Sequence, residues 1–313
     1  MMQKYVIGAL LIALGCGDDS AAVDASVDTG RSPDAGTEDS GAVDAGSDSA
    51  MPDVGIDAGF DAGPIGSAGC VDGASLPEGE NGMDVEGRAR RFMVRLPEGY
   101  SRDRAWPLVF ALHGNGGNPG YWDGTSGDRN IREVLRNDAV LIIPEAIDNA
   151  WRNYDLEREA WGPLMEEELV FFDELITLAT DELCIDEDEI FAMGFSGGGS
   201  FSGVLGCRRT DIRAIAAGGS VIYFDEADCV HTPAAWITIG TEELQPGREA
   251  YRDFFRDRAG CDASSMPTDP DPCIAYDGCG ESTPVHYCQH PGGHRWPDFG
   301  SQAMWDFLST FVD

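Results

Sequence analysis

The sequence predicts an α/β protein whose mostly parallel central sheet carries helices on both faces, preceded by a disordered acidic linker. Three observations carry this prediction. From Cys70 onward short continuous apolar runs alternate with longer stretches of helical periodicity, turn residues separate them, and the acidic stretch before Cys70 has no such pattern. Continuous apolar runs are typical of strands buried on both faces, and their alternation with helices implies parallel pairing.

Composition limits the class of protein. The 313 residues include 56 acidic and 21 basic side chains, a formal net charge of −35, which fits one large domain or two small ones. Forty glycines without a collagen repeat and 42% hydrophobic residues exclude a fibrous protein, a coiled coil and a wholly disordered chain. Phosphate binding requires a basic patch, so the acidic excess argues against nucleic acid or an anionic membrane surface as a partner.

Residues 1–16 have the pattern of an export signal. Lys4 precedes an apolar run over 5–14 that is too short to cross a bilayer permanently. Residues 13–16 (Ala-Leu-Gly-Cys) resemble the bacterial lipoprotein box, so Cys16 is the predicted lipidation site, with ordinary signal cleavage as the alternative. The protein is therefore expected at the cell surface or facing the periplasm as a lipoprotein, and otherwise secreted. A lipid anchor would be its contact with a membrane.

Residues 17–69 are mostly Asp, Ala, Gly and Ser, with too few apolar side chains to form a core. The tripeptide Asp-Ala-Gly recurs there, but it lacks the alternating carboxylates and closing glutamate of a calcium loop. We therefore predict a solvated tether over 17–69 and one folded domain over 70–313.

Within the domain the apolar runs predict strands, and one long periodic stretch over 166–183 predicts a helix. Chemistry in such sheets occurs where the strands end, so functional residues are expected in the loops that follow them. The strands are expected over residues 91–96, 107–112, 139–143, 190–193, 234–239 and 284–287.

Eight cysteines follow Cys16, and an even number in an exported domain predicts four disulfides. Cys184 lies just before the strand at 190, and Cys207 lies near the end of the helix expected after it. Because that helix runs back toward the start of the strand, we predict a Cys184–Cys207 pair. The cysteine spacing does not favour a metal site, and no cofactor is expected.

Residues 194–198 (Gly-Phe-Ser-Gly-Gly) lie between an apolar run and a predicted helix. A nucleophile elbow needs this arrangement: a strand, a tight turn with small neighbours, and a helix whose first amides face the reacting oxygen. Ser196 is therefore the predicted nucleophile. The alternative is a glycine-rich turn with an ordinary capping serine.

A serine nucleophile needs a base, and His294 lies about a hundred residues later in a loop after the last expected strand. His290 is the weaker alternative because it falls near the strand end. His231 and His286 are expected to be structural or solvated.

The acid that orients the histidine should follow a late strand between Ser196 and His294. The run over 234–239 is such a strand and leads into Glu242 and Glu243. Glu243 is the predicted acid and Glu242 the alternative. Both could instead be solvated carboxylates, in which case the acid would be Asp225, Asp228 or Asp253.

An oxyanion hole usually consists of two backbone amides. The amide of Gly197 directly follows the nucleophile, and the second is expected from Asn115, in the glycine-rich loop after the strand over 107–112. His113 is then expected to shape this loop. The absence of a following lysine and of the G-x-G-x-x-G pattern argues against a phosphate cradle.

Together these residues resemble the exported esterases of the α/β-hydrolase fold that include polyhydroxybutyrate depolymerases and type C feruloyl esterases. The resemblance covers about Cys70 to Asp313 and implies Ser196 as nucleophile, His294 as base, and the amides of Asn115 and Gly197 as oxyanion hole. The group usually has Gly-Thr-x-Asp after the strand, whereas this chain has Gly-Thr-Glu-Glu. The shared motifs are LPEGY at 96–100, LHG at 112–114, CID at 184–186, GFSGGG at 194–199, GC at 260–261 and GGHRWP at 292–297.

The resemblance implies two-step transfer of an acyl group from an ester, through an acyl-enzyme. The expected substrates are extracellular esters, including polymeric ones: feruloyl or acetyl groups on plant polysaccharide, or short polyhydroxyalkanoates. The alternatives are a catalytically silent binding module on a surface stalk and a serine peptidase on the same fold. Four aromatic residues fall in loops where they either line a cleft or pack against the domain: Tyr121, Trp122, Trp151 and Trp161.

Overall fold

The computed structural model describes residues 66–73, 76–151 and 161–313, all within the compact unit Phe60–Asp313. The predicted export signal, Cys16 and most of the predicted linker lie outside the described residues. The last residues of that linker are part of the domain: the Ser67 hydroxyl donates to the Leu183 carbonyl (2.7 Å) and accepts from the Ile185 amide (3.0 Å). The packed domain therefore includes Ser67, which its small-residue composition had assigned to the linker.

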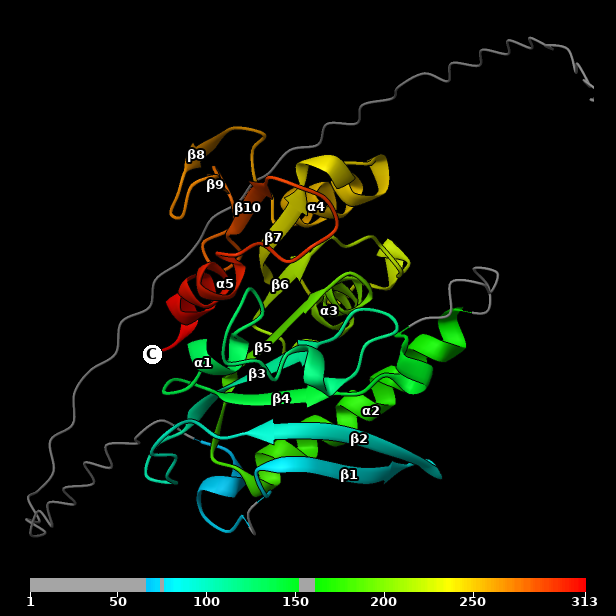
Figure 1. The fold of residues 1–313 in the computed structure, drawn as a ribbon, viewed down its shortest axis with the longest axis vertical. Helices are drawn as coiled ribbons and strands as arrows, with labels where there is room; N and C mark the ends of the chain where they lie inside the picture. The colour runs from blue at the N-terminus through cyan, green and yellow to red at the C-terminus, as the bar shows by residue number, and fades with distance from the viewer. Residues whose placement is uncertain (1–65, 74–75, 152–160) are drawn as a thin grey trace, which may run out of the picture. The chain divides into compact units, whose positions relative to one another are not determined.

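Ten strands form one sheet in the order β1-β2-β4-β3-β5-β6-β7-β10-β9-β8 (Figure 1). The six central strands are parallel, and an antiparallel pair extends the sheet at each end. The bounds are β1 Gly79–Val85, β2 Arg88–Arg95, β3 Trp106–Leu112, β4 Val140–Pro144, β5 Ile185–Phe195, β6 Ala214–Gly218, β7 Ala234–Gly240, β8 Ser265–Pro267, β9 Cys273–Tyr276 and β10 Val285–His290.

Helices cover both faces of the sheet. In Figure 1, α2, α3 and α4 lie on one side of it and α1 and α5 on the other. The bounds are α1 Ile131–Val134, α2 Trp161–Glu182, α3 Gly197–Arg208, α4 Pro246–Arg258 and α5 Gly300–Leu308. The predicted α/β fold with a mostly parallel sheet is thus confirmed.

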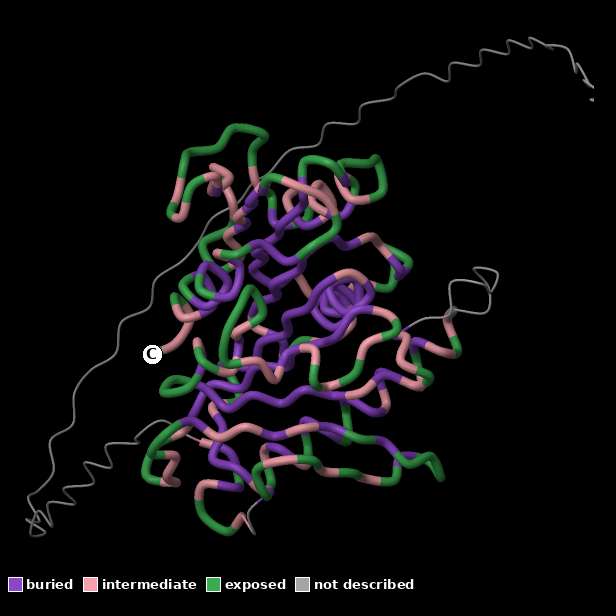
Figure 2. Tube along the Cα trace, viewed as in Figure 1, coloured by how far each residue is buried: buried purple, intermediate pink, exposed green. Residues whose placement is uncertain are grey.

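Two hydrophobic clusters, one on each face, hold these layers together. Alternate side chains of β3 point to opposite faces, so Phe110 joins the cluster with α2 and α3, and Val109 joins the cluster with α1 and α5. Every residue of β3, β4, β6 and β7 is buried, and Figure 2 shows the centre of the sheet buried throughout. This is why these strands read as continuous apolar runs rather than alternating ones.

The predicted strands and the long helix are confirmed, with β5 the largest difference in length. The strand β5 has eleven residues, and the prediction found only its second half. Its first half carries four acidic residues, so a search for apolar runs does not detect it. The strands β1, β6, β8 and β9 were not predicted. β1 and β8 are edge strands with mostly exposed or half-buried side chains, so neither shows an apolar run.

Four disulfides are present, as the even cysteine count predicted, but the predicted Cys184–Cys207 pair is wrong. The eleven residues of β5 span about 36 Å, whereas the twelve residues of α3 return only about 18 Å, so Cys207 stops well short of Cys184. Neighbouring segments supply the partners of both. The pairs are Cys70–Cys184, Cys207–Cys229, Cys261–Cys279 and Cys273–Cys288.

Removing the Cys70–Cys184 bridge with a double change to serine is expected to destabilise the domain more than removing Cys261–Cys279 in the same way. The two bridges join residues 114 and 18 positions apart, and loop entropy makes the longer one worth about 1.6 kcal/mol more. Urea unfolding followed by circular dichroism measures both losses. Equal losses would show that local packing, and not loop closure, sets the contribution.

Candidate active site

Ser196 occupies the turn between β5 and α3 with a backbone φ of 58° and ψ of −122°, a conformation rare for a residue other than glycine. Its neighbours make the turn possible because they lack side chains. A Cβ on Gly194 would lie 2.5 Å from the Gly198 carbonyl carbon, and a Cβ on Gly198 would lie 2.1 Å from the Leu112 carbonyl oxygen. The serine hydroxyl is thereby held out at the carboxyl edge of the sheet.

His294 lies in the loop after β10 and contacts both of its predicted partners. Its Nε2 is 2.8 Å from the Ser196 hydroxyl oxygen, and its Nδ1 is 2.5 Å from Oε2 of Glu243. Because a carboxylate only accepts hydrogen bonds, Nδ1 donates, which leaves Nε2 of the neutral ring free to accept a proton from the serine. The Phe195 ring packs on the imidazole, with centroids 4.6 Å apart.

Glu243 ends the short 3₁₀ turn Thr241–Glu243 that follows β7, and only 5% of the residue is exposed. Its Oε1 accepts the Gly240 amide at 3.0 Å. Burial by itself raises the pKa of the Glu243 carboxyl, but the hydrogen bonds from His294 and Gly240 and the charge of Arg248 outweigh it, and the pKa lies below its ordinary value. The carboxylate is therefore ionised at neutral pH.

The alternative acids do not contact His294. Glu242 is exposed, Asp253 pairs with arginines of its own helix, and Asp225 accepts the amide of Ala227. Asp228 lies 4.0 Å from Arg208, the last residue of α3, whereas Ser196 precedes the first residue of that helix.

The amides of Asn115 and Gly197 lie close together beside Ser196. A Cβ on Gly197 would lie 3.2 Å from the amide nitrogen of Asn115. A Cβ on Gly114 would lie 3.5 Å from the Cβ of Ser196. Among the described residues neither amide donates to a carbonyl. Two unpaired N–H groups at this position can receive the negative oxygen of a tetrahedral intermediate.

The Asn115 side chain fills the space that a side chain at 197 would occupy. A Cβ on Gly197 would lie 2.0 Å from Oδ1 of Asn115. Both polar atoms of this amide are buried without a hydrogen-bond partner in the described chain. The conformation of Asn115, and with it the position of its backbone amide, therefore depends on glycine at 197.

His113 is fully buried beneath this loop and links it to the loop after β4. Its Nδ1 lies 2.8 Å from the Gly114 carbonyl, and its Nε2 accepts the Ala146 amide at 3.2 Å. The Trp151 indole donates to the His113 carbonyl (2.7 Å), and the Trp122 indole donates to that of Leu112 (2.8 Å). The end of β3 is thus fastened on both sides.

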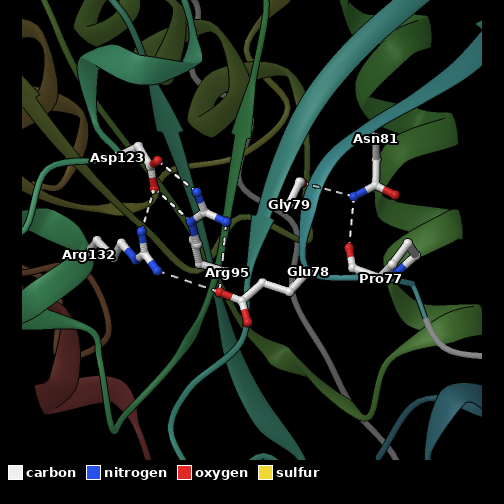
Figure 3. A network of polar contacts seen from close by, with 7 residues as sticks. All are labelled: Pro77, Glu78, Gly79, Asn81, Arg95, Asp123 and Arg132. Atoms are coloured by element: carbon white, nitrogen blue, oxygen red, sulfur yellow. Dashed lines mark hydrogen bonds and ion pairs between the residues drawn. The ribbon is translucent and has the colours of Figure 1, made fainter.

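A polar network ties the far end of the same loop to the sheet (Figure 3). Arg95 of β2 donates two hydrogen bonds of 2.7 Å to the carboxylate of Asp123, the residue after Trp122. Arg132 lies 3.6 Å from the same carboxylate, and Glu78 lies 3.8 Å from both arginines. A bidentate pair of this kind fixes direction as well as distance.

The remaining candidates lie away from the serine. His290 is buried in β10, His231 faces the Ile212 carbonyl, and His286 packs on Phe307. Trp122 and Trp151 are fully buried and pack against the domain, so they do not line an open cleft. The side chain of Trp161 lies outside the described residues.

Neither a metal site nor a membrane span is found in the described part of the chain. No group of three or more His, Cys, Asp or Glu residues there could hold a metal ion. None of the helices there is long and apolar enough to cross a membrane.

A mostly parallel sheet with a serine on the turn after β5, and an acid and a histidine after later strands, defines the α/β-hydrolase class. No family model matches the chain. Feruloyl esterase D of Neurospora crassa is 27% identical over a 274-residue alignment that covers 78% of this chain and 90% of the relative. Feruloyl esterase C of Emericella nidulans is 26% identical over 77% of this chain and 90% of its own length.

Solved structures agree on the fold. A ferulic acid esterase (TM-score 0.52, 15% identity) covers 74% of this chain, and 98% of its own chain is matched. A ferulic acid esterase from Anaeromyces mucronatus in complex with ferulic acid has a TM-score of 0.50 at 16% identity, covering 75% of this chain and 90% of its own. The resemblance of the sequence to esterases of the α/β-hydrolase fold is thereby confirmed.

Gly197→Ala is expected to lower kcat/KM by about 10-fold, because the new methyl group displaces the Asn115 side chain and with it the backbone amide. Overpacking of this kind typically costs about 1 to 3 kcal/mol, and about 1.4 kcal/mol in the transition state corresponds to a factor of ten in rate. The double variant Gly197→Ala/Asn115→Ala removes the clash and should recover most of the loss. Steady-state kinetics with a nitrophenyl ester measure both. A double variant no better than the single one would contradict the coupling.

The buried histidines are expected to lower stability as the pH decreases from about 7 toward 5, whereas the buried carboxyls of Glu168 and Glu189, whose pKa burial raises, act in the opposite direction. Burial lowers the pKa of His113 below its ordinary value of 6.5, so in this range the unfolded chain binds a proton that the folded one does not. Burial acts in the same direction on the pKa of His231 and His286. His113→Gln should flatten the slope by up to about 1.4 kcal/mol per pH unit in urea unfolding. His231→Gln, at a more exposed site, should flatten it less, and an unchanged slope in His113→Gln would refute the assignment.

Proposed function

We propose that the protein is an exported serine carboxylic ester hydrolase in which Ser196 is the nucleophile, His294 the general base and Glu243 the triad acid. The observation that carries this proposal is the continuous chain of contacts from Ser196 Oγ to His294 Nε2 (2.8 Å) and from His294 Nδ1 to Glu243 Oε2 (2.5 Å). These contacts lie at the carboxyl edge of the sheet, beside the backbone amides of Asn115 and Gly197. The ester chemistry is supported by the feruloyl esterases to which the chain is similar.

In the first half of the reaction the Ser196 oxygen attacks the ester carbonyl carbon while its proton passes to Nε2 of His294. The carbonyl π electrons move to the oxygen, which accepts hydrogen bonds from the amides of Asn115 and Gly197. A single such donor is typically worth about 10²- to 10³-fold in kcat. When the tetrahedral intermediate collapses, the bond to the alcohol oxygen breaks and His294 returns the proton to the leaving alcohol.

In the second half water attacks the acyl-enzyme, with His294 again accepting the proton. The same two amides hold the second oxyanion, and collapse releases the acid and restores the Ser196 hydroxyl. Glu243 stays ionised throughout: it fixes the ring tautomer and stabilises the imidazolium that forms twice in each cycle. The low pKa of its carboxyl suits this role, because a neutral acid would lose both effects.

The proposed substrate is an ester of a hydroxycinnamic acid such as ferulic acid, carried on a neutral hydroxyl-rich polymer. The names of the relatives support the acyl part. An open groove of about 730 Å³ supports the polymer part. The Asn149 carbonyl at its wall accepts the Gly116 amide (2.7 Å), so the groove adjoins the proposed oxyanion loop. Its lining combines the amides of Asn81, Asn118 and Asn149 with apolar surface and with three charged residues, Glu80, Arg91 and Glu145, of which Arg91 and Glu145 form an ion pair.

The proposed location is outside the cytoplasm. Four disulfides in the domain indicate folding in an oxidising compartment. We propose in addition that Cys16 is acylated and that residues 17–69 tether the domain to the membrane, on the grounds of the sequence pattern.

Ser196→Ala and His294→Ala are each expected to lower kcat on methyl ferulate by 10⁴-fold or more, and Glu243→Ala by about 10⁴-fold, because the three groups act as a unit. Glu242 is a neighbouring carboxylate that faces solvent, so Glu242→Ala is the matched control and should retain activity. The assay uses the full chain, with circular dichroism to confirm folding of each variant. A short-chain nitrophenyl ester and a feruloylated oligosaccharide run beside methyl ferulate rank the substrates.

A folded wild-type protein that is inert on all three esters would overturn the proposal in favour of a silent binding module. Cleavage of peptide substrates with the esters untouched would favour a peptidase. Equal kcat/KM for methyl ferulate and the feruloylated oligosaccharide would remove the polymer from the proposal but leave the esterase.

A further inference from the structure

Besides His294, the guanidinium of Arg248 lies beside the carboxylate of Glu243. Arg248, in the first turn of α4, places its Nε 3.1 Å from Oε2 of Glu243, the oxygen that also accepts the hydrogen bond from His294. The side chains of Arg248 and Glu243 are only 16% and 5% exposed. An ion pair with so little access to water is screened less than one at the surface, so the charge of Arg248 attracts the carboxylate, although its Nε donates no hydrogen bond within the described chain.

The other end of the same guanidinium holds the backbone beneath the imidazole. Nη1 of Arg248 donates to the carbonyl of Gly219, the first residue after β6. Gly219 has a φ of 58°, and its amide donates to the Thr238 carbonyl in β7 (2.9 Å). A Cβ there would lie 2.8 Å from both Nδ1 and Cε1 of His294. Arg248 thus joins the acid to the loop that supports the histidine ring.

The place of Arg248 in its helix is unfavourable without these partners. The N-terminal turn of a helix carries partial positive charge, which repels a cation. Arg256 and Arg258 lie instead in the last turn of α4, where the helix dipole favours them. Arg248 is therefore held in the first turn by Glu243 and Gly219, against the local field.

A glutamate needs such support more than an aspartate does. It has one more rotatable bond, and fixing a glutamate side chain costs up to about 2 kcal/mol of conformational entropy. Three contacts limit Glu243 to one position: the Gly240 amide on Oε1, and His294 and Arg248 on Oε2.

We propose that Arg248 is a positioning residue of the active site, which clamps Glu243 and Gly219 against His294 and so allows a glutamate to serve as the triad acid. This inference rests on the proposed function. Arg248 acts through its neighbours and does not itself contact the reacting atoms.

The test compares Arg248→Met with Arg252→Met. Arg252 lies one turn further along α4, is also 16% exposed, and pairs with Asp253 instead of the site. Arg248→Met is expected to lower kcat on methyl ferulate by about 10- to 100-fold, the scale of a misplaced catalytic group, with KM changed less than about twofold. Arg252→Met should leave both constants near wild type, and thermal unfolding is recorded for each variant.

Two further variants separate positioning from a merely structural role. Arg248→Lys keeps the charge but loses the planar fork that reaches two partners, so its kcat should fall between those of wild type and Arg248→Met. In Arg248→Ala, added guanidinium ion should raise kcat several-fold by occupying the vacated site, and it should not do so in Arg252→Ala. If Arg248→Met does not fold, the kcat of Arg248→Lys and the guanidinium rescue of Arg248→Ala test the positioning role instead.

Labelling of Ser196 by a fluorophosphonate distinguishes failure of this inference from failure of the proposed function, because it needs an activated serine but no particular ester. A wild type that is not labelled overturns the proposed function and the inference with it. Normal labelling of wild type, together with a kcat within twofold of wild type in Arg248→Met and Arg248→Lys, overturns the clamp alone. Equal rescue of both alanine variants by guanidinium overturns it too.

Discussion

The left-handed backbone of Ser196 is the constraint around which the site is arranged. Holding a non-glycine residue at a φ of 58° costs about 1 to 3 kcal/mol, so the surrounding structure must enforce it. The Ser196 amide donates to the Gly218 carbonyl in β6 (2.7 Å), and its carbonyl accepts the Ser200 amide in α3 (2.9 Å). The strained turn is thereby joined to the strand beside it and the helix after it. Glycines at 194 and 198 give it the room that the close approach of β3 would otherwise deny.

The other groups reach Ser196 because parallel strands end at one edge. β3 leads into the loop of Asn115, β7 into Glu243 and β10 into the loop of His294, and more than 170 residues separate β3 from β10 in the chain. Buried polar contacts then hold each loop in place. The loop after β4 is one example: the Glu168 carboxylate, paired with Arg90 at 2.5 Å, accepts the Ile147 amide at 2.9 Å. Two residues later Asn149 supports the oxyanion loop through its carbonyl. Removing one partner of such a buried pair would leave a charge without compensation.

The acid position shows how a longer side chain is accommodated. A glutamate in place of the usual aspartate could have weakened the link to His294. In this domain the carboxylate is buried, bonded by the Gly240 amide, and shared between an imidazole and a guanidinium. Glu243 is the last residue of the short 3₁₀ turn that follows β7. The same turn leaves Glu242 in solvent, so two adjacent carboxylates have different environments.

The sequence by itself determined the fold class, the central strands other than β6, and the nucleophile turn, and it indicated the residues proposed to meet there. Buried parallel strands must be continuously apolar, and a strained serine turn must be flanked by glycine, so both leave local patterns. The tertiary structure alone decided the disulfide pairing, the edge strands, the choice between Glu242 and Glu243, and the place of Arg248. A cysteine pair depends on the lengths of β5 and α3 together, and edge strands lack an apolar run. Adjacent glutamates are equivalent until the turn directs one of them inward. Nothing in the local sequence indicates that Arg248 pairs with Glu243 five residues earlier, because the contact forms only when α4 packs beside β7.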